Sequence, residues 1–302
     1  MIVVGSVNLD LVYRVPHLPR PGETLLGTDL VRLSGGKGGN QAHAAARVAP
    51  DGLPVTMVGC VGDDEAATLL RGDLERAGAD VSGLRTVPGP SGTALIAVDA
   101  QGENTIVVIP GANAAWPDAV DEDLGFAAGD VVVLQLEVPF AVVEAVVARA
   151  AAAGARVVLN AAPLDRRVAG LLASVDVLVV NEIEAAELFG FDGDLDADAV
   201  AGIAAGLPAT DLVVTLGARG VLFAPSGGAV RSVPAFAVDA IDTVGAGDAF
   251  VGGFAVELAA SGTLESAVRV GAAAGALTAT VAGARHPGLD RAGVERLAGP
   301  RG

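Results

Sequence analysis

The segment 241–250 combines an aspartate with a glycine-rich turn at the expected start of a helix. The turn Gly245-Ala246-Gly247 leaves several backbone N–H groups without partners inside the helix, and the helix dipole favours negative charge there. These groups would form an anion hole, and Asp248 beside them can act as the general base for a hydroxyl that attacks a phosphate. An aspartate in a first helical turn is also explained as a cap, so its position alone leaves both interpretations open.

A second glycine-rich loop, 34–40, contains Lys37, which is the only lysine of the chain. Glycines on both sides of it allow the backbone to approach a ligand closely, and a helix is expected over 41–48. The loop is not a Walker A motif, because no Ser or Thr follows the lysine. All other basic residues are arginines, which indicates a role for a compact ammonium group; the alternative is chance survival of one lysine.

Polar residues or glycines follow five of the predicted strands. They are Asn8 and Asp10, Glu137, Asn160, Asn181 and Gly217. In open α/β sheets, ligands bind in the crevice outside the carboxyl ends of the strands. Any one of these residues is explained as the start of a loop or helix, but their recurrence favours a binding site at this edge.

Asn181 and Glu184 stand three residues apart at the expected start of a helix, so they share one face of it. They can hold a hydrated Mg²⁺, which keeps most of its waters and needs only one or two carboxylates. The alternative is a capping box with Asn181 as the cap. Thr215 and Gly217 belong to a glycine turn that is either an ordinary loop or a place of close approach to a nucleotide.

Short apolar runs alternate with helical segments, which predicts a doubly wound, mostly parallel α/β sheet covered by helices on both faces. The expected strands are 2–4, 55–61, 131–136, 156–159, 175–180 and 212–216, and the expected helices include 140–153, 182–189 and 246–260. The insertions 11–34 and 92–110 lack helices and predict antiparallel hairpins, with β-prone stretches at 24–33, 93–98 and 104–109. We expect one domain over 1–302 in which these insertions form a small β lid.

Composition and charge exclude several classes of function. The hydrophobic content of 52% excludes a disordered chain, and the net charge of -17 would repel both nucleic acid and an anionic membrane surface. Cys60 is the only cysteine, so an intramolecular disulfide and a multi-cysteine metal site are excluded. The first residues do not resemble a signal peptide and no apolar run is long enough to span a bilayer, so we expect a cytoplasmic protein.

Taken together, these motifs resemble the PfkB family of sugar kinases, also called the ribokinase family, over nearly the whole chain. The segment 35–48 is similar to the first family signature and 242–254 to the second, whose Asp-Thr-x-Gly-Ala-Gly-Asp core is highly specific. The segments 6–10, 21–24, 102–104, 110–113 and 135–137 are similar to the ribose-specific branch. The resemblance implies a kinase that uses ATP and Mg²⁺ to phosphorylate the 5-hydroxyl of D-ribose.

The same resemblance implies roles for individual residues. Asp248 would be the catalytic base, and Gly245, Ala246 and Gly247 would form the anion hole. The sugar hydroxyls would be held by Asn8, Asp10, Gly36, Lys37, Asn40, Glu137 and Asp248. The nucleotide would lie along Asn181, Thr215 and Gly217, with Glu184 holding Mg²⁺ through water.

Two further implications concern a monovalent cation and the oligomer. A potassium-type ion beside the anion hole would be bound through Asp242, Val244, Thr278, Val281 and Gly283. Pro287 departs from the family pattern, because a serine is usual there and proline has no hydroxyl to complete the site. The β lid would close over the sugar and pair with a second copy to give a homodimer.

Other functions stay open at this point. They are another kinase of the family, acting on a nucleoside, fructose or a different sugar, and a non-catalytic sugar or nucleotide sensor. The set Asn8, Asp10 and Asn40 favours a small sugar over a nucleoside, and an intact Asp248 favours an enzyme over a sensor. A nicotinamide-dependent oxidoreductase is disfavoured, because Gly-x-Gly-x-x-Gly does not follow the first strand.

Overall fold

A computed structural model describes residues 1–116, 124–207, 209–260 and 262–299 of the chain. Within this part, the main sheet has the strand order β13-β12-β11-β10-β9-β8-β1-β4-β5. Its strands are β1 (Ile2–Val4), β4 (Thr56–Val61), β5 (Leu84–Thr86), β8 (Val131–Leu134), β9 (Arg156–Asn160), β10 (Val177–Asn181), β11 (Asp211–Thr215), β12 (Val221–Ala224) and β13 (Arg231–Val233). The strands from β11 to β5 run parallel, whereas β12 and β13 are antiparallel additions at one edge.

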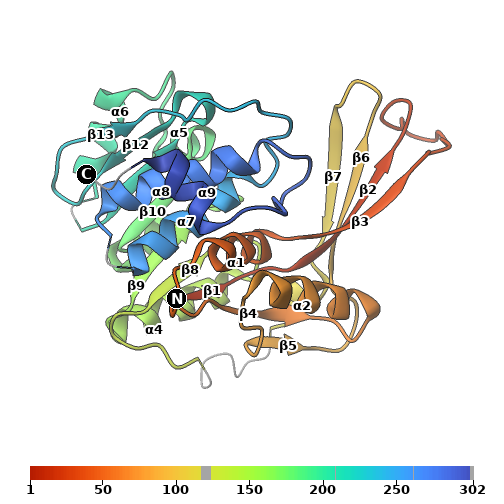
Figure 1. Ribbon diagram of the computed structural model, residues 1–302, viewed down its shortest axis with the longest axis horizontal. Helices are drawn as coiled ribbons and strands as arrows, with labels where there is room; N and C mark the ends of the chain where they lie inside the picture. The colour runs from red at the N-terminus through yellow and green to blue at the C-terminus, as the bar shows by residue number, and fades with distance from the viewer. Residues whose placement is uncertain (117–123, 208, 261, 300–302) are drawn as a thin grey trace.

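Helices cover both faces of this sheet (Figure 1). The helices are α1 (Lys37–Val48), α2 (Glu65–Ala77), α4 (Phe140–Ala152), α5 (Glu182–Phe189), α6 (Ala197–Ala205), α7 (Ala246–Ala259), α8 (Leu264–Thr278) and α9 (Arg291–Ala298). Short 3₁₀ turns lie at η1 (Gly111–Ala114), η2 (Arg166–Gly170), η3 (Leu172–Ser174) and η4 (Gly217–Arg219). No described helix is both long and apolar enough to cross a membrane.

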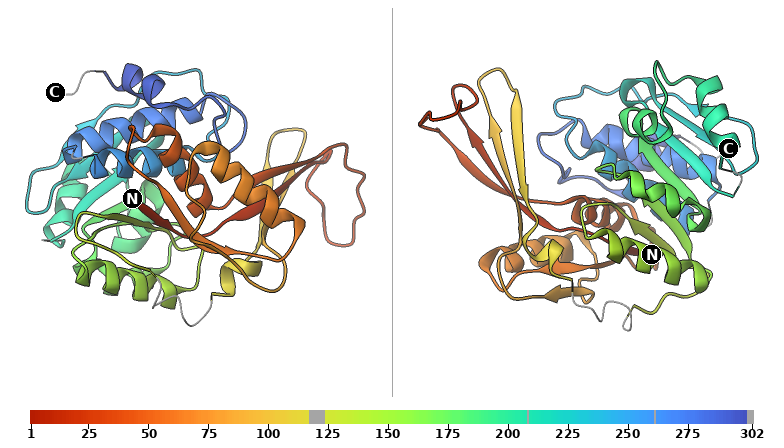
Figure 2. Two further views of the ribbon diagram at one scale, coloured as in Figure 1. Left: turned by 60° about the horizontal axis from the view of Figure 1, so that its bottom comes forward. Right: turned by 180° about the vertical axis from the view of Figure 1, so that it is seen from behind.

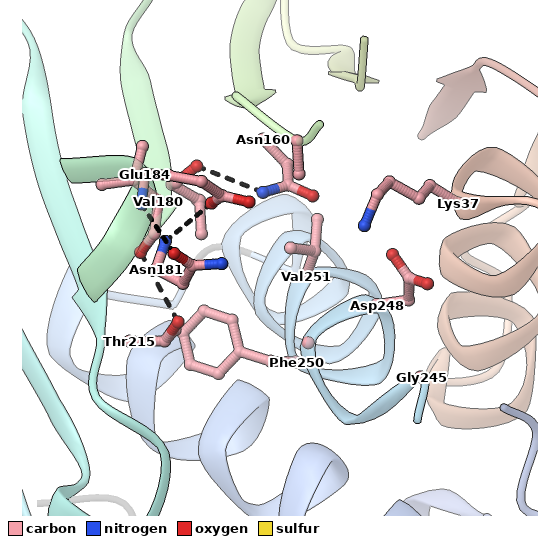
Figure 3. A pocket seen from close by; sticks show the side chains of 13 residues that line it. Lys37, Asn160, Val180, Asn181, Glu184, Thr215, Gly245, Asp248, Phe250 and Val251 are labelled. Atoms are coloured by element: carbon pink, nitrogen blue, oxygen red, sulfur yellow. Dashed lines mark hydrogen bonds between the residues drawn. The ribbon is translucent and has the colours of Figure 1, made fainter. Parts of the chain in front are cut away.

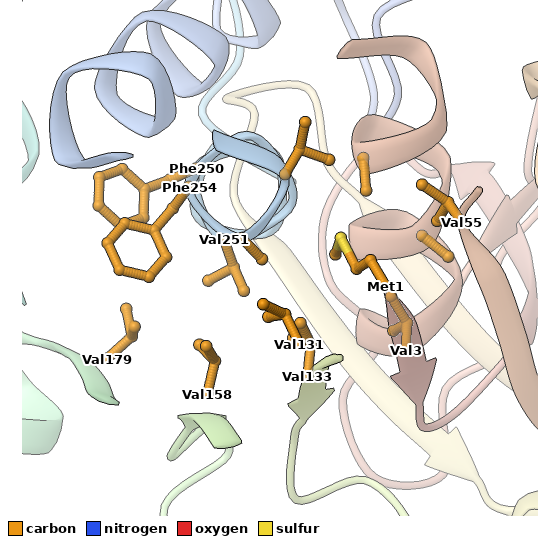
Figure 4. Packing of buried hydrophobic residues seen from close by; sticks show 14 of the residues in the cluster. Met1, Val3, Val55, Val131, Val133, Val158, Val179, Phe250, Val251 and Phe254 are labelled. Atoms are coloured by element: carbon orange, nitrogen blue, oxygen red, sulfur yellow. The ribbon is translucent and has the colours of Figure 1, made fainter. Parts of the chain in front are cut away.

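Successive side chains of each strand point to opposite faces of the main sheet, so a hydrophobic core lies on each face. Val3 and Val133 face one side, where they join the buried residues of α1, α2, α7 and α8. Their neighbours Val4 and Val132 face the other side and pack with α4, α5 and α6. Figure 4 shows the first core, in which Phe250 and other side chains of α7 lie over the sheet. Because α7 is anchored by this packing, its N-terminus is held at a fixed place above the sheet edge.

A second sheet of four strands projects from the body (Figures 1 and 2). It has the order β3-β2-β6-β7, with β2 (Asn8–Arg14), β3 (Leu30–Gly35), β6 (Gly92–Val98) and β7 (Asn104–Ile109). The pairs β2–β3 and β6–β7 are antiparallel hairpins, whereas β2 and β6 run parallel to each other. The predicted α/β fold with a small added sheet is confirmed.

Two local predictions were wrong. The strand expected over 24–33 begins only at Leu30, and beyond it the backbone of Arg14 still bonds to Thr28 and Asp29. Asn8 and Asp10 follow β1 as expected, and both lie on β2. The helix expected over 41–48 begins at Lys37, so the glycine-rich segment forms its first turn. The other predicted strands of the main sheet end within two residues of their expected bounds.

Candidate active site

The N-terminus of α7 brings backbone N–H groups to the carboxyl edge of the sheet. Gly245 precedes the helix with a φ of 74°, and a Cβ there would lie 2.2 Å from the carbonyl oxygen of Ala284, so only glycine fits. No side chain of the described residues caps this helix. A Cβ added to Gly247 would meet open space. The predicted anion hole is therefore open at Gly247, whereas the Ala246 N–H donates to the carbonyl oxygen of Thr243 at 3.2 Å.

Asp248 lies in the first turn of α7 and is 8% exposed. Asn40 donates from Nδ2 to its Oδ2 at 3.1 Å, and Gln41 donates from Nε2 to its Oδ1 at 3.0 Å. Burial raises the pKa of Asp248 above its usual value, and the Lys37 charge and these two hydrogen bonds oppose that rise. A carboxylate that is held on both oxygens and has a raised pKa is suited to general base catalysis.

Lys37 lines the same pocket as Asp248, and its ammonium group lies beside the Asp248 carboxylate (Figure 3). Its backbone N–H donates to Glu137 Oε2 at 3.0 Å, and Ser6 Oγ donates to the same oxygen at 2.6 Å. Burial alone would lower the pKa of Lys37, but the charges of Asp248, Glu137 and Glu184 outweigh it and raise the pKa. The ammonium group is therefore charged at neutral pH, and it supplies positive potential that the acidic surface lacks.

Asn8 and Asp10 reach the same region from β2. Asn8 Oδ1 accepts a hydrogen bond of 2.6 Å from Nδ2 of Asn113, which leaves its own amide N–H₂ for a ligand. Burial raises the pKa of Asp10 to about 7; the Arg285 charge lowers it, and the carboxylates of Glu137 and Asp248 raise it. In the ligand-free protein Asp10 is therefore only partly ionised near neutral pH.

Gly36 is explained by packing within the chain. Its φ is 80°, and a Cβ there would lie 2.8 Å from the backbone nitrogen of Asn8. The tight contact brings the start of α1 against the segment that leads into β2. The glycine is required by this contact whether or not it also touches a ligand, so its predicted contact with a sugar stays a prediction.

Asn181 and Glu184 form the capping box that the sequence left open as one interpretation. Glu184 N–H donates to Asn181 Oδ1 at 2.8 Å, and Asn181 N–H donates to Glu184 Oε2 at 2.8 Å. Both residues nevertheless line the pocket that also contains Lys37, Thr215 and Asp248 (Figure 3). Burial raises the pKa of Glu184, and the Asn181 N–H and Lys37 lower it. The capping box thus holds these side chains in the pocket, where they can still bind a ligand.

Gly217 stands at the first position of η4, two residues after Thr215. Its φ is 56° and a Cβ there would meet open space, so the backbone is accessible at this turn. Thr215 Oγ1 lies 3.5 Å from the carbonyl oxygen of Val180, at the limit of a hydrogen bond. The predicted contact of Thr215 and Gly217 with a nucleotide stays a prediction.

The candidate residues for a monovalent cation also come together. Asp242 accepts from Val244 N–H on Oδ1 at 3.0 Å and from Gly283 N–H on Oδ2 at 2.9 Å, which joins the two loops. Thr278 Oγ1 is buried without a hydrogen-bond partner among the described residues. A carboxylate and carbonyl oxygens suit a hard cation, so the donor set fits. The described residues contain no cluster of three or more His, Cys, Asp or Glu side chains that could hold a metal ion by themselves.

Comparison with known proteins identifies the family. The sequence profile of the pfkB family carbohydrate kinases matches residues 1–291. This chain belongs to that family. It is 37% identical over 290 residues to a ribokinase of Haemophilus influenzae, with 94% of each chain covered. It is also 37% identical over 278 residues to a deoxyribokinase of Salmonella typhi, with 88% of each chain covered.

A solved structure supports the same assignment. The structure of Arabidopsis thaliana ribokinase complexed with ribose and ATP has a TM-score of 0.87 to this chain, with 30% identity. The match covers 98% of this chain and 97% of that one. The predicted PfkB membership is confirmed, and the chain is an ATP-dependent carbohydrate kinase of this family.

Several polar residues of the site were not predicted. Gln41 and Asn113 are buried amides that hold Asp248 and Asn8, and Arg285 reaches Asn40 from the loop after α8. The segment 110–113 is singled out in the sequence only by the family resemblance, and no sequence pattern singles out Arg285. Their roles depend on contacts between residues that lie far apart in the chain, which local patterns do not show.

Proposed function

We propose that this protein is a ribokinase, which transfers the γ-phosphate of ATP to the 5-hydroxyl of D-ribose and gives D-ribose 5-phosphate and ADP. One observation carries the proposal: Asp248 lies at the open N-terminus of α7 with both oxygens held by hydrogen bonds. The printed names of relatives support the choice of sugar. They include the ribokinase of Haemophilus influenzae and the Arabidopsis thaliana ribokinase complexed with ribose and ATP.

The proposed reaction divides the site into two sides. The sugar side comprises Asn8, Asp10, Gly36, Lys37, Asn40 and Glu137, which would hold the ribose hydroxyls. The nucleotide side comprises Asn181, Glu184, Thr215 and Gly217. Lys37 and Asp248 line the same pocket as the nucleotide side and are bonded to the sugar side, so they lie where the two substrates would meet.

Asp248 would accept the proton of the ribose 5-hydroxyl as that oxygen attacks the γ-phosphorus. The sugar O–H bond breaks, a new P–O bond forms, and the bond between the γ-phosphorus and the leaving oxygen of ADP breaks. Backbone N–H groups of Gly245, Ala246 and Gly247 would stabilise the negative charge on the transferred phosphate. The charged Lys37 lies near enough to Asp248 to affect the pKa of its carboxyl and would add to this stabilisation.

Mg²⁺ would be held through water by Glu184, whose carboxyl the capping box keeps in the pocket. When bound, the ion would neutralise charge on the β- and γ-phosphate oxygens. Asn181, Thr215 and Gly217 would lie along the nucleotide. A potassium-type ion would be bound by Asp242 and the carbonyls near Val244, Thr278, Val281 and Gly283. A cytoplasmic location, where ATP is available, fits this activity.

The small sheet would close over ribose and pair with a second copy of the chain. Its edge strand β7 is exposed along its whole length, and Ile106 and Val107 are 52% and 53% exposed. An apolar edge strand with unpaired backbone groups is typical of a surface that another strand covers. Light scattering should therefore give the mass of a dimer, and Val107→Glu should shift it toward the monomer. A monomeric wild type at micromolar concentration would contradict the dimer.

The proposed reaction is tested by ADP release from Mg-ATP with D-ribose, 2-deoxyribose, fructose, adenosine and pseudouridine, each with and without potassium. The expected result is a clear preference for ribose. Preference for 2-deoxyribose, the sugar named in the Salmonella typhi relative, would keep the mechanism and change the acceptor. Turnover on none of the acceptors would contradict the proposal. Asp248→Asn serves as the matched variant that keeps the size of the side chain.

A further inference from the structure

Arg285 enters the sugar side from the loop that follows α8, and its side chain is only 10% exposed. Its Nε donates to Asn40 Oδ1 at 2.9 Å, and Nη1 pairs with Asp73 of α2. Nη2 lies 3.4 Å from the carbonyl oxygen of Gly35. One guanidinium therefore joins α1, α2 and the end of β3 around the predicted sugar site.

The chemistry of the guanidinium fixes the orientation of the Asn40 amide. Arginine has donors and no acceptor, so the Asn40 oxygen must face Arg285. The Asn40 N–H₂ group then faces Asp248, to which it donates at 3.1 Å. Without Arg285, rotation of this amide by half a turn would place its oxygen against the carboxylate and remove the hydrogen bond.

Two glycines near Arg285 leave the space that its loop and side chain occupy. A Cβ on Gly39 would lie 2.8 Å from Nη2 of Arg285, so the glycine leaves the space that the guanidinium fills. Ala284, the residue before Arg285, contacts Gly245 so closely that no side chain fits there. The same loop therefore touches the predicted anion hole with one residue and the predicted sugar site with the next.

We propose, on the basis of the proposed sugar kinase function, that Arg285 is a positioning residue for the sugar: it holds the Asn40 amide in the orientation that binds the sugar and supports Asp248. Arg285 acts through Asn40 and takes no part in the proton transfer itself. Lysine cannot replace it fully, because one ammonium group cannot reproduce the fork that reaches Asn40 and Asp73 in a fixed plane.

The test compares wild type, Arg285→Met, Arg285→Lys and Asn40→Ala, together with the double variant R285M/N40A. Steady-state kinetics give kcat and the KM values for ribose and ATP, and calorimetry gives the ribose Kd even where turnover is low. Arg285→Met should weaken ribose binding about tenfold, the effect of losing one hydrogen bond to a charged group, and leave the KM for ATP within about twofold. Arg285→Lys should fall between Arg285→Met and wild type.

Arg291→Met is the matched control for loss of structure. Arg291 also lies in the C-terminal part of the chain, and it pairs at 2.8 Å with the buried Glu257, away from Asp248. The control should lower the melting temperature and leave the KM values for ribose and ATP unchanged. A fall in stability alone therefore cannot produce the ribose-specific effect that we expect for Arg285→Met.

The double variant decides whether Arg285 acts through Asn40. In the Asn40→Ala background, Arg285→Met should cause a clearly smaller loss of ribose affinity, limited to the effect of the Arg285 charge on Asp10. A tenfold loss in that background as well, or an equal rise of the KM for ribose and ATP in Arg285→Met, would overturn the inference. If wild type phosphorylates none of the acceptors, the proposed function falls and the inference with it; if wild type is active, only the inference is at stake.

Discussion

The sugar side and the nucleotide side of the site are built from different kinds of contact. On the sugar side, buried hydrogen bonds join residues far apart in the sequence: Asn40 to Asp248 across 208 positions, and Arg285 to Asn40 across 245. On the nucleotide side, Asn181 and Glu184 bond to each other three positions apart, at an exposed helix start. One side is therefore assembled by the tertiary fold, and the other by a local helix motif.

This difference teaches where the effects of a substitution should appear. The polar residues around Asp248 form a connected network, since Gln41 also bonds to Asn160 at 3.1 Å and accepts from Gln135 at 2.6 Å. A change in such a network affects every member. A change in the capping box affects only the start of α5 and the part of the nucleotide that would lie beside it. The sugar side is thus the more preorganised part of the site. A substitution on the nucleotide side should leave the sugar side unchanged.

The largest expected effect is that of Asp248→Asn, at the point where both sides meet. The amide keeps the size of the carboxylate but cannot take the proton, so turnover should fall at least about a hundredfold. Ribose binding should weaken but survive, because the new amide keeps one acceptor oxygen for Asn40 or Gln41 and places its N–H₂ group against the other. ADP release and ribose calorimetry measure the two quantities separately. Near-normal turnover would contradict the role of the base.

The second prediction concerns pH and the carboxyl of Asp10. Burial raises its pKa from 3.8 to about 7, so the neutral form is favoured in the folded, ligand-free protein. The contribution of Asp10 to the free energy of unfolding is therefore fully present below about pH 4 and is lost as the pH rises through about 7. If Asp10 holds a sugar hydroxyl as an ionised acceptor, ribose affinity should rise in the same range, roughly tenfold between pH 6 and 8.

Calorimetry of ribose binding across this range measures the Asp10 effect, with Asp10→Asn as the comparison. The asparagine variant should bind ribose with little dependence on pH, because its amide does not titrate. A flat profile in wild type would mean that Asp10 is not an ionised ligand for the sugar. Asp10→Asn should leave the pH dependence of ATP binding unchanged, because none of the nucleotide-side contacts among the described residues involves Asp10.

The same contrast explains what the sequence could predict. The parallel sheet followed from continuous apolar runs, and the capping box from the spacing of Asn181 and Glu184, because both are local patterns. The backbone donors of Gly245, Ala246 and Gly247 were also predicted from a local pattern, the glycine-rich turn before a helix. By contrast, Gln41, Asn113 and Arg285 acquire their roles only when distant segments meet in the fold. Their residue types alone fit ordinary surface or core positions.

The errors in the predicted elements have the same origin. The glycines before Asn40 indicated a loop, but Gly38 lies so close to Ser6 that a Cβ would be 2.7 Å from its backbone nitrogen. Close packing of α1 against this segment compensates for the low helix propensity of glycine. The strand β2 begins at Asn8, ahead of the hairpin insertion expected from residue 11, because Asn8 and Asp10 interrupt its apolar pattern with polar side chains. Both misassignments fall on the sugar side, where tertiary contacts decide the local structure.

A smaller effect is expected from the nucleotide side, where Asn181→Ala removes the cap of α5. Loss of an asparagine cap should lower the free energy of unfolding by about 1 kcal/mol. The Glu184 backbone N–H loses its acceptor, and the Asn181 amide is no longer present in the pocket, so the KM for ATP should rise severalfold while the ribose Kd stays unchanged. Thermal melting and steady-state kinetics measure these effects. A change in ribose affinity equal to that in the KM for ATP would show that the two sides are not separable.

The smallest effect is expected from Pro287→Ser, beside the predicted cation site. Asp242 already joins its loop to Gly283 through a hydrogen bond of 2.9 Å, so the scaffold of the site exists without an ion. A serine would add one hydroxyl oxygen as a potential ligand. Potassium should therefore activate the variant more than wild type, and sodium at equal ionic strength serves as the control for salt effects. An equal potassium response in both proteins would mean that this position does not contribute to cation binding.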